Sequence, residues 1–160
     1  MPNQALMNIV LVNPDIPGNT GSIGRTCVAL GMRLILIKPY GFEITEKALR
    51  RAGLDYWKHV NLTEYDSIED FFEGENPDSE TLHFFSRFSK KPYFESKYLE
   101  GHYLIFGSET QGLPKELFDR FPERFVTLPM YSEHIRSLNL SNTACAAAYE
   151  ALRQLNFNPS

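Results

Sequence analysis

Polar side chains that could bind a ligand crowd together shortly before the last predicted helix of the chain. Within six positions lie Arg136, Ser137, Asn139 and Ser141, directly ahead of an alanine-rich run. Ser141 is predicted to cap that helix, because its hydroxyl can accept a hydrogen bond from a free backbone N–H group of the first turn. The loop therefore offers donors, acceptors and free N–H groups to a ligand, although an ordinary loop before a capped helix would carry the same residues.

A second polar segment follows the first predicted strand. Two prolines and Gly18 force a turn after the apolar run Ile9–Val12. Asn19 or Thr20 can then cap a helix, and Arg25 projects from it.

A third polar segment follows a later strand. The apolar run that begins at Tyr103 ends at Gly107, the carboxylate of Glu109 comes directly afterwards, and Gly112 and Pro114 interrupt the loop. In open α/β sheets, ligands bind just beyond the carboxyl ends of the strands. The three segments together therefore predict one shared site.

The predicted elements alternate along the chain and indicate an α/β fold with a mostly parallel sheet and helices on both faces. The expected strands are Asn8–Asn13, Arg33–Lys38, His59–Leu62, Thr81–Ser86, His102–Gly107 and Arg124–Leu128. The expected helices are Asn19–Leu30, Glu46–Arg51, Ser67–Glu73, Lys115–Arg120 and Ser141–Leu155. The segment Phe88–Glu100 fits neither pattern.

Length and composition describe an ordinary globular domain. The chain has 160 residues, 42% apolar and 22% charged, and we expect residues 1–160 to form a single domain. We expect a cytoplasmic protein, since there is neither a membrane-length apolar run nor a signal-peptide pattern. Cys27 and Cys145 lie in apolar helical segments and are expected to be reduced, and without clustered His/Cys ligands a metal site is not expected.

The charge balance is unusual for a protein that binds nucleic acid. The formal net charge is −4, whereas RNA-binding proteins are usually basic. Basic residues nevertheless cluster locally, first as Lys47, Arg50 and Arg51 and then as Arg87, Lys90 and Lys91. Many of the acidic residues fall between Glu64 and Glu80, which could lie away from a bound RNA.

The order and spacing of the three polar segments resemble those of the SPOUT superfamily of S-adenosylmethionine-dependent RNA methyltransferases. The matching pieces are Asn19-Thr20-Gly21 with Arg25, the run Phe106–Pro114, Leu128-Pro129-Met130, and Arg136–Ser141. Similarity also extends over Arg50–Tyr56 and Tyr149-Glu150-Ala151, and so over nearly the whole chain. Within the superfamily the chain is most similar to the minimal TrmL type, which methylates the ribose 2'-hydroxyl of the wobble nucleotide in certain tRNAs.

This resemblance implies a fold, a cofactor and partners. It implies a C-terminal deep trefoil knot, a homodimer, S-adenosylmethionine bound among the knot loops, and a tRNA substrate. The residues that match the family's catalytic positions are Arg25, Asn19, Glu109 and Asn139. The residues that match its cofactor-binding positions are Phe85, Gly107, Leu128, Met130 and Ser137.

Methyl transfer to a hydroxyl requires that the methyl donor and the oxygen be held in line and that the hydroxyl lose its proton. The resemblance gives Arg25 the task of activating that hydroxyl. A guanidinium has a pKa above about 12 and is therefore a poor base at neutral pH. Stabilising the developing alkoxide, or orienting a phosphate, requires no deprotonated arginine.

Several alternatives stay open at the level of sequence. The enzyme could act on another tRNA position or on ribosomal RNA, or the chain could be a non-catalytic knotted module that binds RNA. A nucleotide-binding Rossmann enzyme is disfavoured, because Gly18, Gly21 and Gly24 do not have the GxGxxG spacing. The run Ser86–Lys91 departs from the family pattern, since the bulky Phe88 stands where relatives often carry glycine.

Overall fold

Six parallel strands form one sheet in the computed structural model, which describes residues 5–40, 42 and 55–155. The strand order is β3-β2-β1-β5-β4-β6. The bounds are β1 Asn8–Val12, β2 Arg33–Ile37, β3 Asn61–Tyr65, β4 Leu82–Phe85, β5 Tyr103–Phe106 and β6 Phe125–Val126. Every strand pair is parallel, so the carboxyl ends of the strands meet at one edge of the sheet. The predicted parallel α/β sheet is confirmed.

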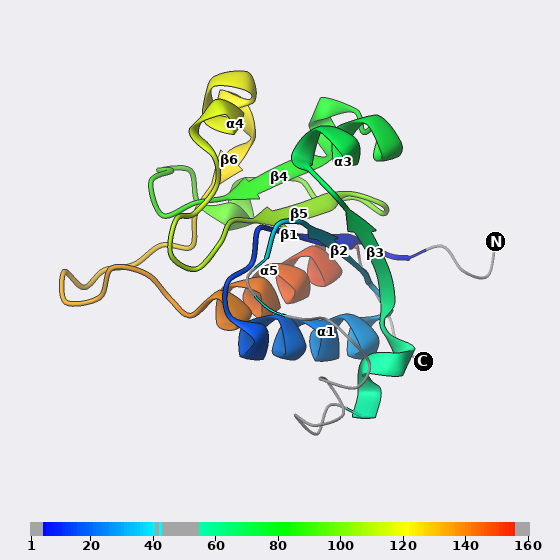
Figure 1. Cartoon of the computed structure of the whole chain (residues 1–160). Coiled ribbons are helices and arrows are strands. Elements are labelled where there is room, and N and C mark those ends of the chain that lie inside the picture. Colours follow the sequence, from blue (N-terminus) through cyan, green and yellow to red (C-terminus); the bar gives the residue numbers. More distant parts are fainter. Residues whose placement is uncertain (1–4, 41, 43–54, 156–160) are drawn as a thin grey trace.

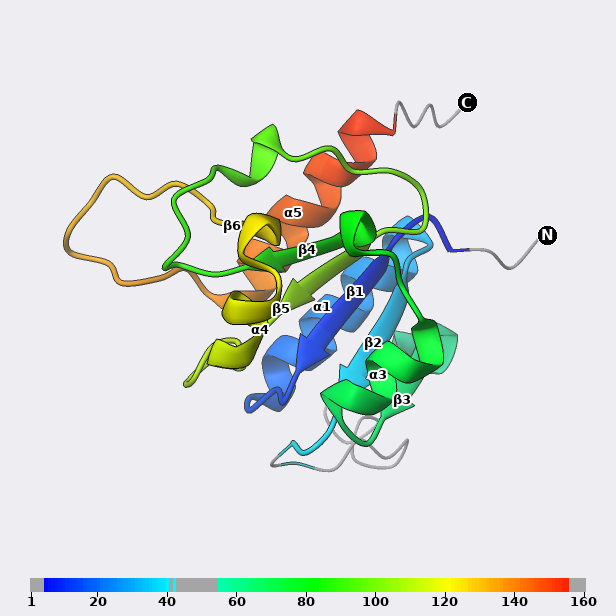
Figure 2. The ribbon, with the colours of Figure 1, turned by 90° about the horizontal axis from the view of Figure 1, so that it is seen from above.

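Helices cover both faces of this sheet, as predicted (Figure 1). Helices α1 (Pro17–Leu30) and α5 (Leu140–Gln154) lie on one face, and α3 (Ile68–Glu75) and α4 (Lys115–Arg120) lie on the other. Figure 2 shows the sheet between these two layers. Successive residues of β1 point to opposite faces, so each strand supplies both cores. Short 3₁₀ helices complete the described chain: η1 Asp55–His59, η2 Ser79–Thr81, η3 Tyr93–Glu95 and η4 Pro122–Arg124.

The alanine-rich face of α5 packs inside the chain. Ala144, Ala147, Ala148 and Ala151 are fully buried in the core that also holds Cys27 of α1. Small side chains allow α5 to approach α1 and β5 closely. This face is therefore not available to a second subunit. Both cysteines are free thiols, as expected.

Two predictions of helix caps are wrong. Helix α1 begins at Pro17, and its N-cap residue, Ile16, makes no side-chain cap hydrogen bond. Proline is favoured as the first helical residue, because the N–H group that it lacks would have no partner in the helix. Asn19 is instead buried within the first turn. At α5 the cap is Asn139, and the hydroxyl of Ser141 donates to the Asn139 side chain instead of capping the helix itself.

The third strand was also misplaced by sequence reasoning. It was expected at His59–Leu62 but lies at Asn61–Tyr65, because the preceding residues form η1. The ring of Trp57 in η1 packs so tightly on α1 that a Cβ atom at Gly24 would lie 2.5 Å from it. As an edge strand, β3 is only partly buried, and its sequence lacks the apolar run of a central strand.

The remaining predicted elements agree with the structure, with shifts at some ends. The predicted α4 is confirmed residue for residue, and β6 is two residues long, shorter than predicted. The unassigned segment Phe88–Glu100 is irregular apart from η3. The predicted helix Glu46–Arg51 lies outside the described residues, as do Lys47, Arg50 and Arg51.

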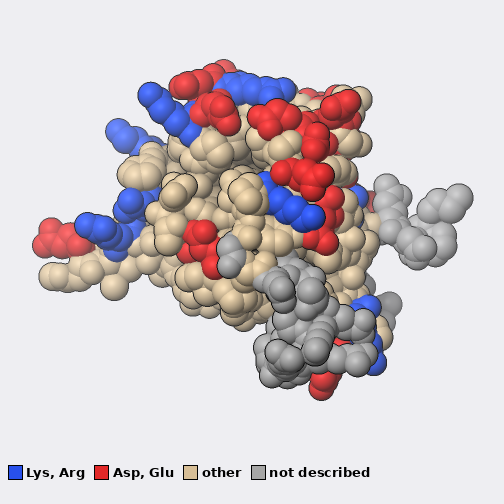
Figure 3. All heavy atoms as spheres, in the orientation of Figure 1, with Lys and Arg blue, Asp and Glu red and all other residues tan. Residues whose placement is uncertain are grey.

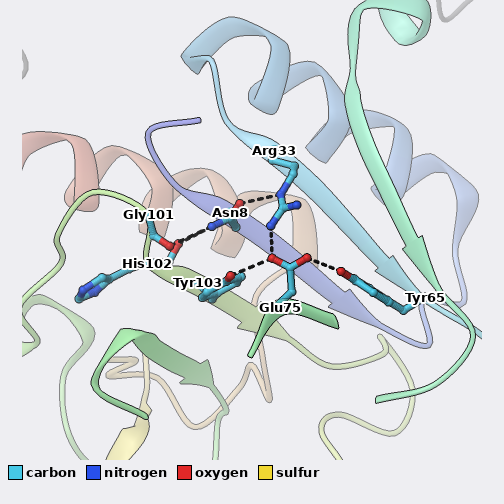
Figure 4. A network of polar contacts seen from close by, with 7 residues as sticks. All are labelled: Asn8, Arg33, Tyr65, Glu75, Gly101, His102 and Tyr103. Atoms are coloured by element: carbon cyan, nitrogen blue, oxygen red, sulfur yellow. Dashed lines mark hydrogen bonds and ion pairs between the residues drawn. The ribbon is translucent and has the colours of Figure 1, made fainter. Parts of the chain in front are cut away.

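A polar network ties together the amino ends of the central strands, opposite the predicted site (Figure 4). Glu75 at the end of α3 forms an ion pair with Arg33 of β2 and accepts hydrogen bonds from Tyr65 and Tyr103, the latter at 2.8 Å. Arg33 also donates to Asn8 of β1 at 2.8 Å. Burial raises the pKa of Glu75, but the hydrogen bonds from Tyr65, Arg33 and Tyr103 outweigh burial and hold this pKa below its ordinary value.

We expect Glu75→Ala to lower the free energy of unfolding by about 3 kcal/mol, because it leaves the Arg33 guanidinium without its carboxylate. The stabilisation by Glu75 should be complete above the ordinary glutamate pKa of 4.5 and should disappear as the pH falls through the lowered pKa of the folded state. Urea unfolding at neutral pH and at pH values below 4.5 measures both effects. Glu73→Ala, at an exposed position of the same helix, is the control. Equal stability of the two variants would contradict this account.

Candidate active site

A pocket of about 520 Å³ opens at the carboxyl edge of the sheet. It lies between the segments that follow β1, β4, β5 and β6, at the point where the strand order reverses direction between β1 and β5. Eight of the nine predicted site residues line it: Asn19, Phe85, Gly107, Glu109, Leu128, Met130, Ser137 and Asn139. The fold therefore brings together segments that are far apart in the sequence, and the pocket has the size of a small-molecule site.

Glu109, Asn19 and Asn139 form a chain of hydrogen bonds along one wall of this pocket. The Asn19 amide donates to Glu109 at 3.1 Å, and the Asn139 amide donates to Asn19 at 3.1 Å. The Asn139 oxygen accepts the backbone N–H groups of Ser141 and Asn142 at 2.9 and 3.2 Å. The hydrogen bonds of these side chains are made with one another and with backbone, so the three residues fix the relative positions of the loops that carry them.

Glu109 also supplies the cap that helix α1 lacks. Its carboxylate accepts the backbone N–H groups of Asp15 and Ile16 at 2.9 and 3.0 Å. A carboxylate is favoured there by the free N–H groups and the positive end of the helix dipole. Thr110 reinforces the contact, since its hydroxyl donates to Asp15 at 2.5 Å. The loop after β5 is thereby fastened to the start of α1.

The floor of the pocket is aromatic. Phe85 at the end of β4 stacks on Phe106 at the end of β5, with ring centroids 4.7 Å apart and an interplanar angle of 21°. Both rings are buried, Phe85 with 7% of its surface exposed. A flat apolar floor of this kind suits a planar heterocycle.

Gly107 sits where two stretches of backbone meet. A Cβ atom at this position would lie 2.1 Å from the carbonyl carbon of Gly112 and 2.3 Å from the backbone nitrogen of Leu113. The loop folds back here, because Gly112 donates its N–H to the Ser108 carbonyl at 2.9 Å and adopts a φ of 70°. Only glycine at position 107 permits this approach, which shapes the pocket edge.

Arg25 is the one predicted residue that does not line the pocket. It is exposed on α1, with its guanidinium carbon 5.4 Å from the centroid of the Tyr56 ring in η1. The Tyr56 hydroxyl donates to the Gly21 carbonyl at 2.8 Å, which fixes the ring beside the helix. Burial raises the pKa of the Tyr56 hydroxyl, and the nearby charge of Arg25 acts in the opposite direction. The Arg25 guanidinium is thus held beside the Tyr56 ring, outside the pocket formed by its own chain.

Among the pocket residues that were not predicted as site residues, three carry an exposed charged or aromatic side chain. Arg87 and Phe88 lie in the turn after β4, and Arg136 lies in the loop before α5; all three are exposed at the pocket mouth. Arg136 was named in the polar cluster before the last helix but was not assigned a role in the site. Phe88 was noted only as a departure from the family pattern. The signal that could have found them is their position just beyond predicted strands.

Neither a metal centre nor a membrane segment appears in the part of the chain that the structure describes. Among residues 5–40, 42 and 55–155, no group of three or more His, Cys, Asp or Glu side chains could hold a metal ion. Within the same residues, no helix is long and apolar enough to cross a membrane.

Comparison with known proteins identifies the family. Residues 6–149 match the SpoU rRNA Methylase family, and the chain belongs to it. A Burkholderia cenocepacia protein named tRNA (cytidine(34)-2'-O)-methyltransferase is 42% identical over 153 residues, which cover 95% of this chain and 97% of that protein. A Bacillus subtilis protein that provisionally bears the same name is 46% identical over 158 residues, covering 97% of both chains. The resemblance to the SPOUT superfamily is confirmed.

Solved structures agree with this assignment. A structure described as giving insights into the 2-OH methylation of C/U34 on tRNA has a TM-score of 0.85 and 41% identity, and the match covers 96% of this chain and 98% of that one. The Streptomyces viridochromogenes methyltransferase AviRb, solved in complex with AdoMet, has a TM-score of 0.76 and 25% identity, over 94% of this chain and 58% of its own.

The pocket fits the cofactor of this family, S-adenosylmethionine. The pocket lining combines the apolar side chains of Phe85, Leu128 and Met130 with the exposed hydroxyl of Ser137, a mixture that suits a ligand with a planar heterocycle and polar groups.

Proposed function

We propose that this chain is an S-adenosylmethionine-dependent methyltransferase that acts on the ribose 2'-hydroxyl of the wobble nucleotide, cytidine or uridine, in the tRNA anticodon loop. The observation that carries the proposal is the convergence of Asn19, Glu109, Ser137 and Asn139 on one pocket beyond the aromatic floor. The names of the relatives support the reaction and the target. We further propose that residues 1–160 act as one domain in the cytoplasm, where tRNA is modified.

The residues of this chain would contribute position and charge. The cofactor supplies an activated methyl group on a sulfonium. The protein must hold this methyl group in line with the ribose 2'-hydroxyl and help that hydroxyl to lose its proton. Glu109, Asn19 and Asn139 hold the loops that would line the cofactor, and their hydrogen bonds are already made within the protein. They act as positioning residues in this proposal, and Arg25 is the group assigned to the reacting oxygen.

The position of Arg25 supports a homodimer. It does not line the pocket of its own chain, so it would reach a reacting ribose held in the pocket of a second subunit or an RNA that spans two subunits. An exposed tyrosine, Tyr149, with 54% of its surface accessible, leaves an apolar contact available on α5. The buried alanines of that helix pack within the chain and offer no contact to a second subunit.

Analytical ultracentrifugation tests the dimer. At micromolar concentrations the protein should sediment with twice the 18.4 kDa mass of the chain. Arg25→Ala should remain dimeric if the residue serves the reaction and not the interface. A monomer that still methylates tRNA would overturn the dimer proposal.

We also propose that the C-terminal segment forms a deep trefoil knot. Helix α5 lies against the segment that precedes β5, and Gln154 exchanges hydrogen bonds with the backbone of Ser96 and Tyr98 at 2.9 and 3.0 Å. The chain reaches this position from β6 at the far edge of the sheet, through the loop of residues 127–139 (Figure 2). A crystal structure that traces residues 82–155 tests whether this path is threaded.

The distribution of charge supports RNA binding despite the negative net charge of −4. Figure 3 shows many acidic side chains on the upper right, around α3, and several lysines and arginines on the left, where some acidic atoms lie beside them. Arg87, Lys90 and Lys91 are all exposed after β4. A local basic surface is sufficient to attract a phosphate backbone.

Mass-spectrometric mapping of ribose methylation in tRNA tests this function. Cells that lack the protein should lose 2'-O-methylation at nucleotide 34 of particular tRNAs, and expression of the chain should restore it. Loss at another tRNA position, or in ribosomal RNA, would support the alternative substrates. Unchanged methylation throughout would favour the non-catalytic RNA-binding module.

A further inference from the structure

An exposed aromatic ring stands at the tip of a turn beside the pocket mouth. Ser86-Arg87-Phe88-Ser89 form a β-turn, in which Ser89 donates its N–H to the Ser86 carbonyl at 3.2 Å. Phe88 at the tip has 72% of its surface exposed. The guanidinium carbon of Arg87 lies 4.5 Å from the centroid of the Phe88 ring. This Phe–Arg pair presents an aromatic ring and a positive charge to solvent beside a ligand pocket.

The turn is held firmly to the sheet. Ser86 donates its N–H to the Val126 carbonyl at 2.9 Å, and its hydroxyl accepts the N–H of Phe88 at 3.2 Å. The hydroxyl of Ser89 donates to the Phe125 carbonyl at 2.9 Å. The backbone that presents Phe88 is therefore preorganised, and binding to the ring would cost little ordering of the loop.

We propose that Arg87 and Phe88 form a stacking platform for one base of the RNA substrate, with Phe88 beneath the base and Arg87 beside its phosphate. This inference rests on the proposed function, and it adds a binding site for the RNA. Unpaired bases stack on aromatic rings whatever their identity, and an arginine adds attraction to both ring and phosphate. An anticodon loop offers such unpaired bases.

The ligand of the platform is RNA and not the adenine of the cofactor. The enclosed apolar surface of the pocket is its floor, made by Phe85 and Phe106. Phe88 stands at the mouth, largely in solvent. The sequence from Thr81 to Phe94 carries Arg87, Lys90 and Lys91 and no acidic residue, so its charge is complementary to a polyanion.

Binding of an anticodon stem-loop RNA to the full-length protein, with the demethylated cofactor present, tests the platform. Phe88→Ala should raise the dissociation constant for RNA roughly tenfold, within the range found for base–aromatic stacking. Phe88→Trp should restore tight binding, because it keeps a π-face. The matched control is Phe94→Ala: Phe94 is also an exposed phenylalanine, with 50% of its surface accessible, but it lies outside the pocket lining. The affinity for the cofactor, measured by calorimetry, should be unchanged in every variant.

Removing bases from the RNA one at a time identifies the stacked base. With the unmodified protein, one abasic position should weaken binding about as much as Phe88→Ala does. With Phe88→Ala, the same abasic RNA should bind no more weakly than the intact RNA. Arg87→Ala should lower the slope of log affinity against log salt by about 0.7, the value for one single-strand phosphate contact, and Phe88→Ala should leave that slope unchanged.

The possible failures are distinguishable. If the unmodified protein neither binds nor methylates RNA, the proposed function fails and the platform fails with it. If the unmodified protein is active and Phe88→Ala binds RNA equally well, only the platform is overturned. If Phe88→Ala weakens cofactor binding, the ring serves the cofactor and the platform is likewise overturned. If every abasic position weakens RNA binding by the same factor in Phe88→Ala as in the unmodified protein, no base stacks on this ring and the platform is overturned.

Discussion

Gly107→Ala should weaken binding of S-adenosylmethionine by about a hundredfold while leaving most of the sheet intact. Its Cβ atom would lie 2.1 Å from the Gly112 carbonyl carbon and 2.5 Å from the Gly112 oxygen. Both are backbone atoms that no rotamer change can move, so the loop of residues 108–113 must shift. We expect a cost of about 3 kcal/mol or more, since overpacking that moves backbone lies at the upper end of such effects. If that cost falls on the bound form, affinity drops by about a hundredfold.

Calorimetric titration with the cofactor measures this effect, and circular dichroism monitors the fold. Gly18→Ala is the control, because a Cβ atom there meets nothing within 4 Å and the position lies in the exposed first turn of α1. That variant should bind the cofactor normally and unfold at the same or a slightly higher temperature. Normal binding by Gly107→Ala would show that this edge of the pocket does not hold the cofactor.

Arg25→Ala should separate catalysis from cofactor binding. Methyl transfer at saturating cofactor and tRNA should fall by roughly a hundredfold or more, the usual loss when a charge-stabilising group is removed. Cofactor affinity should be retained, because Arg25 does not line the pocket of its own chain. Arg25→Lys should rescue the rate poorly, since an ammonium cannot grip a phosphate with two parallel hydrogen bonds. Ser137→Ala should show the reverse pattern, with weaker cofactor binding.

Single-turnover kinetics paired with cofactor titrations decide the role of Arg25. Arg153→Ala removes the same charge from an exposed position of α5 away from the pocket and should keep the normal rate. Turnover by Arg25→Ala close to that of the unmodified protein would reduce Arg25 to a surface residue stacked on Tyr56. If Arg25→Ala loses cofactor binding in step with the rate, Arg25 serves the cofactor and not the reacting ribose, and the role assigned here is wrong.

Much of the fold could be predicted because the central strands have a clear sequence pattern. The runs that became β1, β2 and β5 are buried on both faces and are almost purely apolar. Strand β3 was misplaced because an edge strand carries no such run. The caps were misassigned for a different reason: Glu109 caps α1 from 93 residues away in the sequence, and such a contact leaves no local pattern.

The candidate site was predicted well where its residues follow strands, and less well elsewhere. Asn19 and Arg25 were assigned to one site, yet six residues of helix turn about 600°, which places the two side chains about 120° apart. The structure accordingly buries Asn19 in the pocket wall and leaves Arg25 exposed beside Tyr56. Phe88 follows a predicted strand closely, but the turn fastened to β6 that places its ring at the mouth leaves no local pattern in the sequence.

The most direct test of the central proposal is methyl transfer by the purified protein to a tRNA transcript, in EDTA, with the product mapped by mass spectrometry. We predict one methyl group per tRNA, on the ribose of nucleotide 34, and none on a tRNA that carries a single 2'-deoxynucleotide at that position. Transfer to the deoxy-substituted tRNA, methylation at another nucleotide, or no transfer to any tRNA that the protein binds would contradict the account.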